Sequence, residues 1–444
     1  MTGKGLICKL GSHQVIEGAD RIVQVDMFGE TIITQKTSKE GTIGILFDCE
    51  TQLTIDYAGT NNMFRHSNLN KDKNVIGYMD DNGRIKPIKL KGVKCSGLWM
   101  PLESLLFTES RPIDLLGIHF TIGSEISEIN GIKICRKYIS PKTAKTLNNK
   151  EGKVKENLTP TFKEHFDTDQ WGRNMDKAKI GNLITITEKL HGTSARCGYL
   201  PTIQKQSWWK KLFNIEVPTK YNFVVGSRRV VKSISGEEIN NKEHFYDTDL
   251  WTKVSKKYFE DKLHKGETVY FEIVGYTPEM STIMPSVPND KLKKFLDKNE
   301  YKLFIELYGD TTVFNYNCSD VNLSLNEVYV YRITQTNDDG QSIDYSWQQV
   351  KIRCEQLNVN HVPELSQYIE EPELDDEHKY TTNLVNILTD EQSEIFPNHV
   401  REGVCIRIDN GNLTPLVLKN KSFIFKVLEG IIKDKDVVDL EESN

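Results

Sequence analysis

Hydrophobic and polar residues alternate over several short segments near the start of this chain, which is the pattern of half-buried β-strands. Clear examples are Arg21–Asp26, Thr31–Thr34 and Thr42–Phe47, and Gly, Asn and Asp residues lie between such segments. Short strands separated by turn residues are typical of small closed sheets. This pattern therefore predicts a small β-barrel over roughly the first 130 residues.

A later alternating segment, Ile184–Thr187, runs directly into a lysine and a turn that contains glycine. The stretch reads I-T-I-T-E-K-L-H-G-T-S, with Lys189 at the end of the predicted strand and Gly192 in the turn. A strand end is a rigid platform, and the turn leaves room for a ligand. A lysine amine is a nucleophile only when it is deprotonated, and a neighbouring positive charge or a dry pocket favours that form.

Further strand-like segments in the C-terminal half carry polar groups that suit a binding site. They are Phe223–Arg229, which ends with arginines; Val269–Gly275, which carries Glu272; Val328–Ile333, which carries Tyr331; Glu402–Arg407; and Leu416–Lys421. On the last segment Lys419 and Lys421 alternate with Asn420, so both lysines point to one face of the strand.

Taken in order, these segments resemble the motifs of the covalent nucleotidyltransferases, the superfamily of ATP-dependent ligases and capping enzymes. The stretch at Lys189 resembles motif I, and the later segments resemble motifs Ia, III, IIIa, IV and V. The resemblance implies that Lys189 attacks the alpha phosphate of ATP and forms a lysyl-AMP, with Glu188, His191 and Gly192 in the nucleotide site. It also implies an α+β fold in which an adenylyltransferase domain has antiparallel sheets flanked by helices.

The cationic and aromatic residues of these segments fit that chemistry. Lys419 and Lys421 could hold the alpha phosphate and lower the pKa of the nucleophilic lysine by like-charge repulsion. Arg228 could hold a phosphate or carboxylate through its planar fork, with Arg229 as the alternative. Tyr331 offers a flat face for the adenine base. The structural alternatives are an exposed strand face for the lysines and an ordinary core position for the tyrosine.

Two glutamates, Glu272 and Glu402, would bind the ribose and a metal ion. Glu272 lies in an apolar strand and needs a partner, which ribose hydroxyls or a metal could supply. Glu402 suits the outer shell of Mg²⁺ or Mn²⁺, which neutralises a triphosphate and keeps several of its waters. The alternatives are a structural arginine beside Glu272 and a simple turn at Glu402.

Histidine at position 191 narrows the resemblance. Many members of the superfamily carry aspartate at the third position of K-x-D-G, whereas K-x-H-G-T is similar to a branch of template-dependent RNA ligases. The histidine therefore favours an RNA ligase over a DNA ligase or a capping enzyme. A catalytic role for His191 and a structural one, satisfied by local hydrogen bonds, both stay open.

A basic stretch near the front of the chain, Gly83–Lys94, suits a phosphate backbone. Lys89 and Lys91 would share a strand face, and Lys86 and Lys94 would join them if the chain bends on either side. The alternative is a solvated edge strand, because lysine blunts sheet edges.

The same region resembles the OB domain that precedes the adenylyltransferase domain in the family 5 RNA ligases. DNA ligases and capping enzymes carry an OB domain after motif V instead, and too few residues follow Lys421 for one here. We therefore expect an OB-like domain over residues 1–135, a linker over 136–166 and the ligase domain over 167–444.

The composition adds limits. A formal net charge of −6 argues against a broadly basic nucleic-acid binder, so contacts would come from local patches. The eight cysteines show no C-x-x-C spacing and predict free thiols in a reducing, cytoplasmic setting. No apolar run is long enough for a membrane span, and we expect a monomer. Trp208–Trp209 among lysines could stack bases or could belong to an amphipathic helix.

The sequence thus predicts an ATP-dependent RNA ligase that requires Mg²⁺ or Mn²⁺. We expect it to seal 3′-hydroxyl/5′-phosphate breaks in nicked RNA or RNA/DNA duplexes, with RNA required on the 3′-hydroxyl side. The alternatives are an ATP-dependent DNA ligase and a non-catalytic nucleic-acid-binding protein on the same fold.

Overall fold

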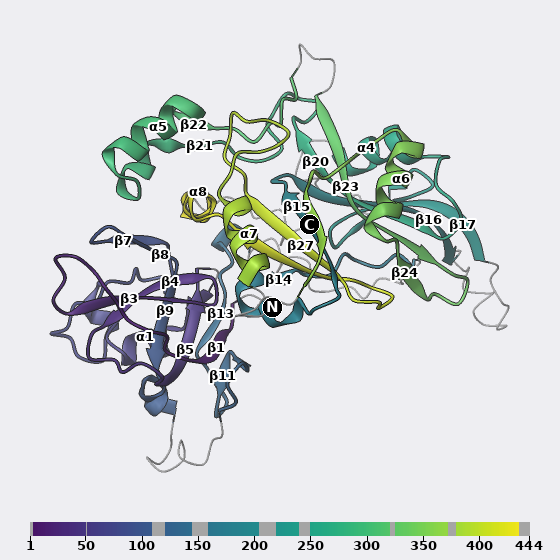
Figure 1. Cartoon of the computed structure of the whole chain (residues 1–444). Helices are drawn as coiled ribbons and strands as arrows, with labels where there is room; N and C mark the ends of the chain where they lie inside the picture. Colours follow the sequence, from purple (N-terminus) through teal and green to yellow (C-terminus); the bar gives the residue numbers. More distant parts are fainter. Residues whose placement is uncertain are drawn as a thin grey trace.

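The computed structural model describes residues 3–49, 51–108, 120–143, 159–203, 219–238, 249–319, 325–371 and 379–434. The Trp208–Trp209 pair and the middle of the expected linker lie outside the described residues, so the two alternatives for the tryptophans stay open. Figure 1 shows the purple N-terminal strands on one side of the molecule and the green and yellow strands of the later chain on the other.

The N-terminal part is built from small antiparallel sheets. The main one has the order β10 (Glu125–Ile126), β1 (Gly5–Lys9), β5 (Ile43–Asp48) and β9 (Gly97–Pro101). A second sheet joins β2 (Gln14–Val15), β3 (Ile22–Met27) and β4 (Glu30–Gln35). Two-stranded pairs are formed by β6 (Thr51–Leu53) with β13 (Cys135–Lys137), β7 (Ile88–Leu90) with β8 (Val93–Cys95), and β11 (Glu128–Ile129) with β12 (Ile132–Lys133).

The strands predicted from alternation in this part are confirmed as β3, β4 and β5. Their inward residues enter two adjoining apolar clusters, one with Ile45 and Phe47 and the other with Val25 and Ile32. Among the described residues, the strand pairings do not close into a barrel. The α+β class is therefore confirmed, and the OB-type barrel stays a prediction.

The described later part of the chain contains two main sheets and a two-stranded pair of β21 (Val287–Pro288) with β22 (Thr311–Thr312). The smaller has the order β14 (Asp169–Gln170), β28 (Leu416–Lys421), β27 (Gly403–Asp409), β15 (Leu183–Lys189) and β26 (Glu364–Ile369). The larger has the order β19 (Glu237–Glu238), β18 (Val231–Ile234), β17 (Thr219–Ser227), β16 (Thr193–Ile203), β20 (Glu267–Gly275), β23 (Asn326–Thr336) and β24 (Ser342–Asp344), with β25 (Asn360–His361) beside β23. All six motif-bearing segments are strands or strand ends of these two sheets.

Helices cover these sheets. The helix α4 (Leu250–Phe259) packs on β17 and β16, α6 (Trp347–Leu357) on β23, and α7 (Lys379–Thr389) on β27. Three further α-helices in the described part of the chain are α1 (Ile55–Thr60), α5 (Lys298–Tyr308) and α8 (Phe423–Asp434). Trp251, Phe271 and Trp347 lie in the large apolar cluster between helices and sheet, which buries their side chains almost fully.

Ion pairs join the N-terminal part to the rest of the chain. Lys426 of α8 lies 2.8 Å from Glu30 of β4, and Arg173 lies 3.1 Å from Asp48. Both pairs are mostly withdrawn from solvent, so water screens them less than an exposed pair. Two largely buried ion pairs therefore link the two parts.

Both described ends of the expected linker belong to folded structure. At one end Arg136 and Lys137 pair with Gln52 and Thr51 in the β13–β6 ladder. At the other end, segment 162–163 lies along the larger sheet, where its carbonyl oxygens accept hydrogen bonds from Arg196 and Tyr270. The division into an OB-like domain, a linker over 136–166 and a ligase domain stays a prediction.

The predicted free thiols are confirmed, since none of the eight cysteines forms a disulfide. In the described ranges no helix has both the length and the apolar character that crossing a bilayer would require.

A buried ion pair under α6 gives a stability prediction. Arg353 donates to both carboxylate oxygens of Glu267, at 2.7 and 2.9 Å, and Glu267 is fully buried. Replacing Arg353 with methionine leaves that carboxylate buried beside no guanidinium, so we expect the free energy of unfolding to fall by about 3–5 kcal/mol. Chemical denaturation measures this loss.

The matched control on the same helix is Lys351→Met. Lys351 pairs with Glu364 at 2.7 Å, but both side chains are partly open to solvent. This substitution should cost about 1 kcal/mol or less. Equal losses in the two variants would contradict the larger contribution expected of the buried Arg353–Glu267 pair.

Candidate active site

The turn after β15 carries the chain from the smaller sheet to the larger one. Lys189 is the last residue of β15, and β16 begins at Thr193 in the other sheet. A side chain on Gly192 would collide with the backbone of Ile273 on β20, so only glycine lets the turn press against the larger sheet. The lysine therefore lies at the junction of the two sheets.

Strand register places three lysines on one face of the smaller sheet. Lys189 on β15 pairs with Gly403 on β27, and Gly403 pairs with Lys421 on β28. Two residues further along β27, Cys405 pairs with Lys419. Cross-strand partners point to the same side of a sheet. The prediction that Lys419 and Lys421 share a face is confirmed, and that face also carries Lys189.

Glu402 is the anion of this cluster. Its Oε1 lies 2.8 Å from Lys189 Nζ and 3.5 Å from Lys421 Nζ, and its Oε2 lies 3.5 Å from His191 Nδ1. Burial opposes ionisation, but Lys189, Lys421 and His191 together hold the pKa of Glu402 below its ordinary value. The carboxylate is therefore charged at neutral pH and fixes the positions of its cationic neighbours.

His191 sits beneath this cluster, outside the cavity described below. Its ring lies edge-on between Phe314 and Phe425, with centroid distances of 4.8 Å, and its backbone N–H donates to the Tyr316 hydroxyl at 2.7 Å. These contacts support the structural alternative for His191, while its approach to Glu402 ties it to the site.

A cavity of about 120 Å³ opens between the two sheets. Its walls include Lys189 and Lys419 from the smaller sheet and Ser194, Arg228, Glu272 and Tyr331 from the larger. Ser194 donates a hydrogen bond of 2.9 Å to Glu272. The structure thus brings most of the predicted site residues around one cavity, whereas Lys421, Glu402, His191 and Gly192 lie beside it.

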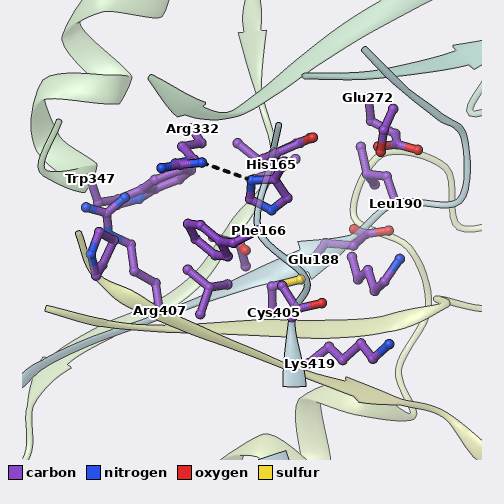
Figure 2. A pocket seen from close by; sticks show the side chains of 18 of the residues that line it. His165, Phe166, Glu188, Leu190, Glu272, Arg332, Trp347, Cys405, Arg407 and Lys419 are labelled. Carbon is purple, nitrogen blue, oxygen red and sulfur yellow. Dashed lines mark hydrogen bonds between the residues drawn. The ribbon is translucent and has the colours of Figure 1, made fainter. Parts of the chain in front are cut away.

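Sequence reasoning missed several residues on the same cavity. His165, Phe166 and Thr168, from the end of the expected linker, line it together with Arg332, Asp344, Trp347 and Arg407. Figure 2 shows His165 and Phe166 among the side chains from both sheets, with a dashed bond between His165 and Arg332. For His165 and Phe166 the signal in the sequence is an aromatic pair ahead of the first motif, whereas Arg332 and Arg407 lie inside the motif-bearing segments Val328–Ile333 and Glu402–Arg407.

Several of these residues contact one another and form an aromatic and cationic side of the cavity. Asp344 holds Arg332 through two hydrogen bonds of 2.5 and 3.0 Å, and the guanidinium lies 4.4 Å above the Phe166 ring. The His165 ring lies 5.0 Å from that of Tyr331. Burial and the nearby arginines hold the pKa of His165 well below its ordinary value, so its imidazole is neutral at pH 7.

The structure separates the two candidate arginines of the second motif. Arg228 lines the cavity and donates to Asp167 at 2.7 Å. Arg229 lies 4.0 Å from the same carboxylate, and its side chain is 40% exposed. Of the two arginines, Arg228 is the one that lines the cavity.

Glu188 is committed to protein contacts. One oxygen accepts from the backbone N–H of Glu394 at 2.8 Å, and Arg401 Nε lies 3.9 Å away. Burial raises the pKa of Glu188 despite these partners. Glu188 lines the cavity, but its carboxylate is bound to Glu394 and Arg401.

The described residues offer no cluster of three or more His, Cys, Asp or Glu side chains that could hold a metal ion directly. Glu402 and Glu272 remain as single carboxylates at the site. Within the described part of the chain, Glu402 Oε2 has only the distant His191 contact, which leaves an acceptor suited to a water molecule of a hydrated cation.

The basic stretch of the N-terminal part forms the β7–β8 hairpin. Lys89 pairs with Lys94 across the hairpin, whereas Lys91 lies in the turn with φ of 51°. The expectation that Lys89 and Lys91 share a strand face is therefore wrong, because the strand ends at Leu90. Lys94 lies 3.3 Å from Glu300 of α5, and Lys86 lies 3.0 Å from Asp434 of α8. A nucleic-acid role for these lysines stays a prediction.

Comparison with known proteins identifies what this arrangement resembles. The family model described as RNA ligase matches residues 182–428, more than half of the chain. Curated protein sequences gave no match. Among solved structures the chain is similar to Naegleria gruberi RNA ligase with pyrophosphate, at 16% identity and a TM-score of 0.56, covering 95% of this chain and 97% of that one.

Two further structures of that enzyme are similar over the same length. A mutant with ATP and Mn is 18% identical, with a TM-score of 0.54 and coverage of 98% and 100% of the two chains. A mutant with AMP and Mn is 17% identical, with a TM-score of 0.55 and coverage of 95% and 97%. At these identities the likeness establishes a shared fold.

A buried histidine beside the site gives a pH prediction. Burial is the main cause that lowers the pKa of His399 from 6.5 to about 4, against a hydrogen bond to the Val400 carbonyl. The folded-state pKa is below the unfolded one, so the unfolded chain binds the proton first as the pH falls. Stability is complete above pH 6.5 and is lost towards pH 4, by about 3 kcal/mol for this residue.

Unfolding free energies at pH 7 and pH 4 measure this. The wild type should lose about 3 kcal/mol more between those two values than His399→Gln, which cannot take up the proton. The control His66→Gln removes an exposed imidazole and should follow the wild type. An unchanged pH dependence in His399→Gln would contradict the prediction.

Proposed function

The chain belongs to the RNA ligase family, and from this premise we propose that it is an ATP-dependent RNA ligase. Its reaction would join a 3′-hydroxyl and a 5′-phosphate across a break in a nicked RNA or RNA/DNA duplex. The observation that carries the proposal is the placement of Lys189 at the sheet junction, beside Glu402 and on one face with Lys419 and Lys421.

In the first step the amine of Lys189 would attack the alpha phosphate of ATP, forming a phosphorus–nitrogen bond and releasing pyrophosphate. The amine must first lose its proton. The ammonium groups of Lys419 and Lys421 favour that loss, whereas Glu402 opposes it while it is paired with Lys189. The same two lysines would hold the charge that develops on the phosphate.

The cavity suits the nucleoside part of ATP. Tyr331 and Phe166 provide aromatic faces for the base, and Glu272 with Ser194 provides polar groups for the ribose. Arg228 is placed for a phosphate oxygen. The Naegleria relatives were solved with ATP and Mn and with AMP and Mn, which supports ATP and a divalent cation here.

Glu402 and Glu272 would hold Mg²⁺ or Mn²⁺ through its waters, and the bound cation would neutralise part of the triphosphate charge. In the second step AMP would pass from Lys189 to the 5′-phosphate of the nick. In the third, the 3′-hydroxyl would attack that phosphate and AMP would leave, so that one ATP is consumed for each bond formed.

The N-terminal part would hold the duplex as an OB-type module, with Lys86, Lys89, Lys91 and Lys94 as its phosphate contacts. Such contacts predict an affinity that falls as the salt concentration rises. The alternative of a DNA ligase keeps the same chemistry and differs only in the sugar that is accepted. A non-catalytic binder is disfavoured by the intact lysines and glutamate.

The direct test of the first step is transfer of label from ATP, labelled in the alpha phosphate, to the protein. Lys189→Ala lacks the attacking amine, so we expect labelling to fall by at least about 1,000-fold. Lys179→Ala, which removes an exposed lysine outside the site, should label like the wild type. Labelling of Lys189→Ala at the wild-type rate would refute the assignment of the nucleophile.

The test of substrate choice is a set of four nicked duplexes with RNA or DNA on either side of the break. We expect rapid sealing whenever the 3′-hydroxyl end is RNA, because a protein can recognise the 2′-hydroxyl and the A-form shape. The sugar on the 5′-phosphate side should matter little. If an all-DNA nick sealed as fast, the DNA-ligase alternative would replace this proposal.

A further inference from the structure

One face of α8 meets the N-terminal part through charged groups. Lys426, Glu429 and Lys433 recur at intervals of three and four residues, so they share a side of the helix. Lys426 Nζ lies 2.8 and 2.9 Å from the two carboxylate oxygens of Glu30. Arg84 Nη1 lies 3.1 Å from the carboxylate of Asp434 at the end of the helix.

The other side of α8 is anchored in the ligase core. Phe425 and Leu428 are buried in the large apolar cluster. The Ser422 hydroxyl accepts a hydrogen bond of 3.1 Å from the Phe425 backbone N–H, which caps the start of the helix directly after β28. The helix is therefore fixed from both sides, and Figure 1 shows it between the N-terminal strands and the yellow sheet.

Glu429 on the charged face reaches back to a lysine of the site. Its two oxygens lie 3.1 and 3.2 Å from Lys421 Nζ, closer than the 3.5 Å that separates Lys421 from Glu402. Lys421 is almost fully buried, with 7% of its side chain exposed. One ammonium group is thus shared between a carboxylate of the site and a carboxylate of α8.

We propose that Glu429 is a positioning residue for Lys421, and that it makes α8, braced by the N-terminal part, a component of the nucleotidyl-transfer apparatus. This inference rests on the proposed function. A lysine side chain has four rotatable bonds, and a fixed second carboxylate limits where its ammonium can lie. Without Glu429 the ammonium would lose this restraint and be drawn towards Glu402, which would make it less available to a phosphate.

The brace from the N-terminal part has the same consequence. The pair of Lys426 with Glu30 and that of Arg84 with Asp434 hold the helix that carries Glu429. A shift of α8 would therefore move Glu429 relative to Lys421, although none of the described residues of the N-terminal part lines the cavity between the two sheets. The N-terminal part would influence the reaction at Lys189 as well as hold the duplex.

The experiment measures single-turnover labelling of Lys189 from ATP over a range of ATP concentrations, with the full chain. Glu429→Gln should lower the maximal rate by about 10-fold, as expected for loss of a hydrogen-bonded charge, with the half-saturating ATP concentration changed by less than about 2-fold. In the Lys421→Ala background the same substitution should change the rate by less than about 2-fold, because the group it positions is absent.

Lys433→Gln is the matched control. It removes the other lysine beside Glu429, at 3.0 Å, and leaves the contact with Lys421, so its labelling rate should stay within about 2-fold of the wild type. If Glu429→Gln does not fold, Glu429→Asp is used in the same cycle, since it keeps the charge but shortens the reach.

The outcomes separate this inference from the function on which it rests. A wild-type protein that takes no label from ATP would overturn the ligase proposal and this inference with it. A wild type that labels while Glu429→Gln labels equally fast would overturn the inference alone. So would a loss that persists undiminished in the Lys421→Ala background, because the effect would then not pass through Lys421.

Discussion

The charge on Glu402 is the constraint around which the site is organised. Lys189 and Lys421 are half-buried or buried cations on one sheet face, and like charges so placed repel each other strongly unless an anion lies between them. Glu402 supplies that anion directly before β27. The next residue is Gly403, where a side chain would collide with the backbone of Asn420 on the neighbouring strand. The cluster is therefore held together by charges within the protein itself.

Chain connectivity places this cluster at the junction of two sheets. Because β15 and β16 follow each other in sequence but belong to different sheets, the turn between them must lie where the sheets meet. The smaller sheet brings Lys189 and Lys419 to the resulting cavity, and the larger sheet brings Tyr331 and Glu272. Arg228 and Arg332 add positive charge from the side of the larger sheet, so cationic groups approach the cavity from both sides.

The sequence predicted those features whose physical cause is local. Alternation located the motif-bearing strands, and the spacing of Lys419 and Lys421 was enough to place both on one face. His165 and Phe166 could not be found in this way, because their role depends on the path of the chain back across the larger sheet. Glu429 belongs to the same class: its position on a helix is visible in sequence, but its distance to Lys421 depends on how α8 packs.

The contact between Lys426 and Glu30 has a consequence for the order in which the molecule is completed. The two residues are separated by 396 positions, so β4 emerges from the ribosome long before the helix that covers it. Until then Glu30 and the neighbouring Cys49 lack the partner that later buries them. The surface on which α8 packs must therefore remain exposed during most of translation. Because this surface is charged, it stays hydrated and is less prone than an apolar surface to associate with other chains before α8 is made.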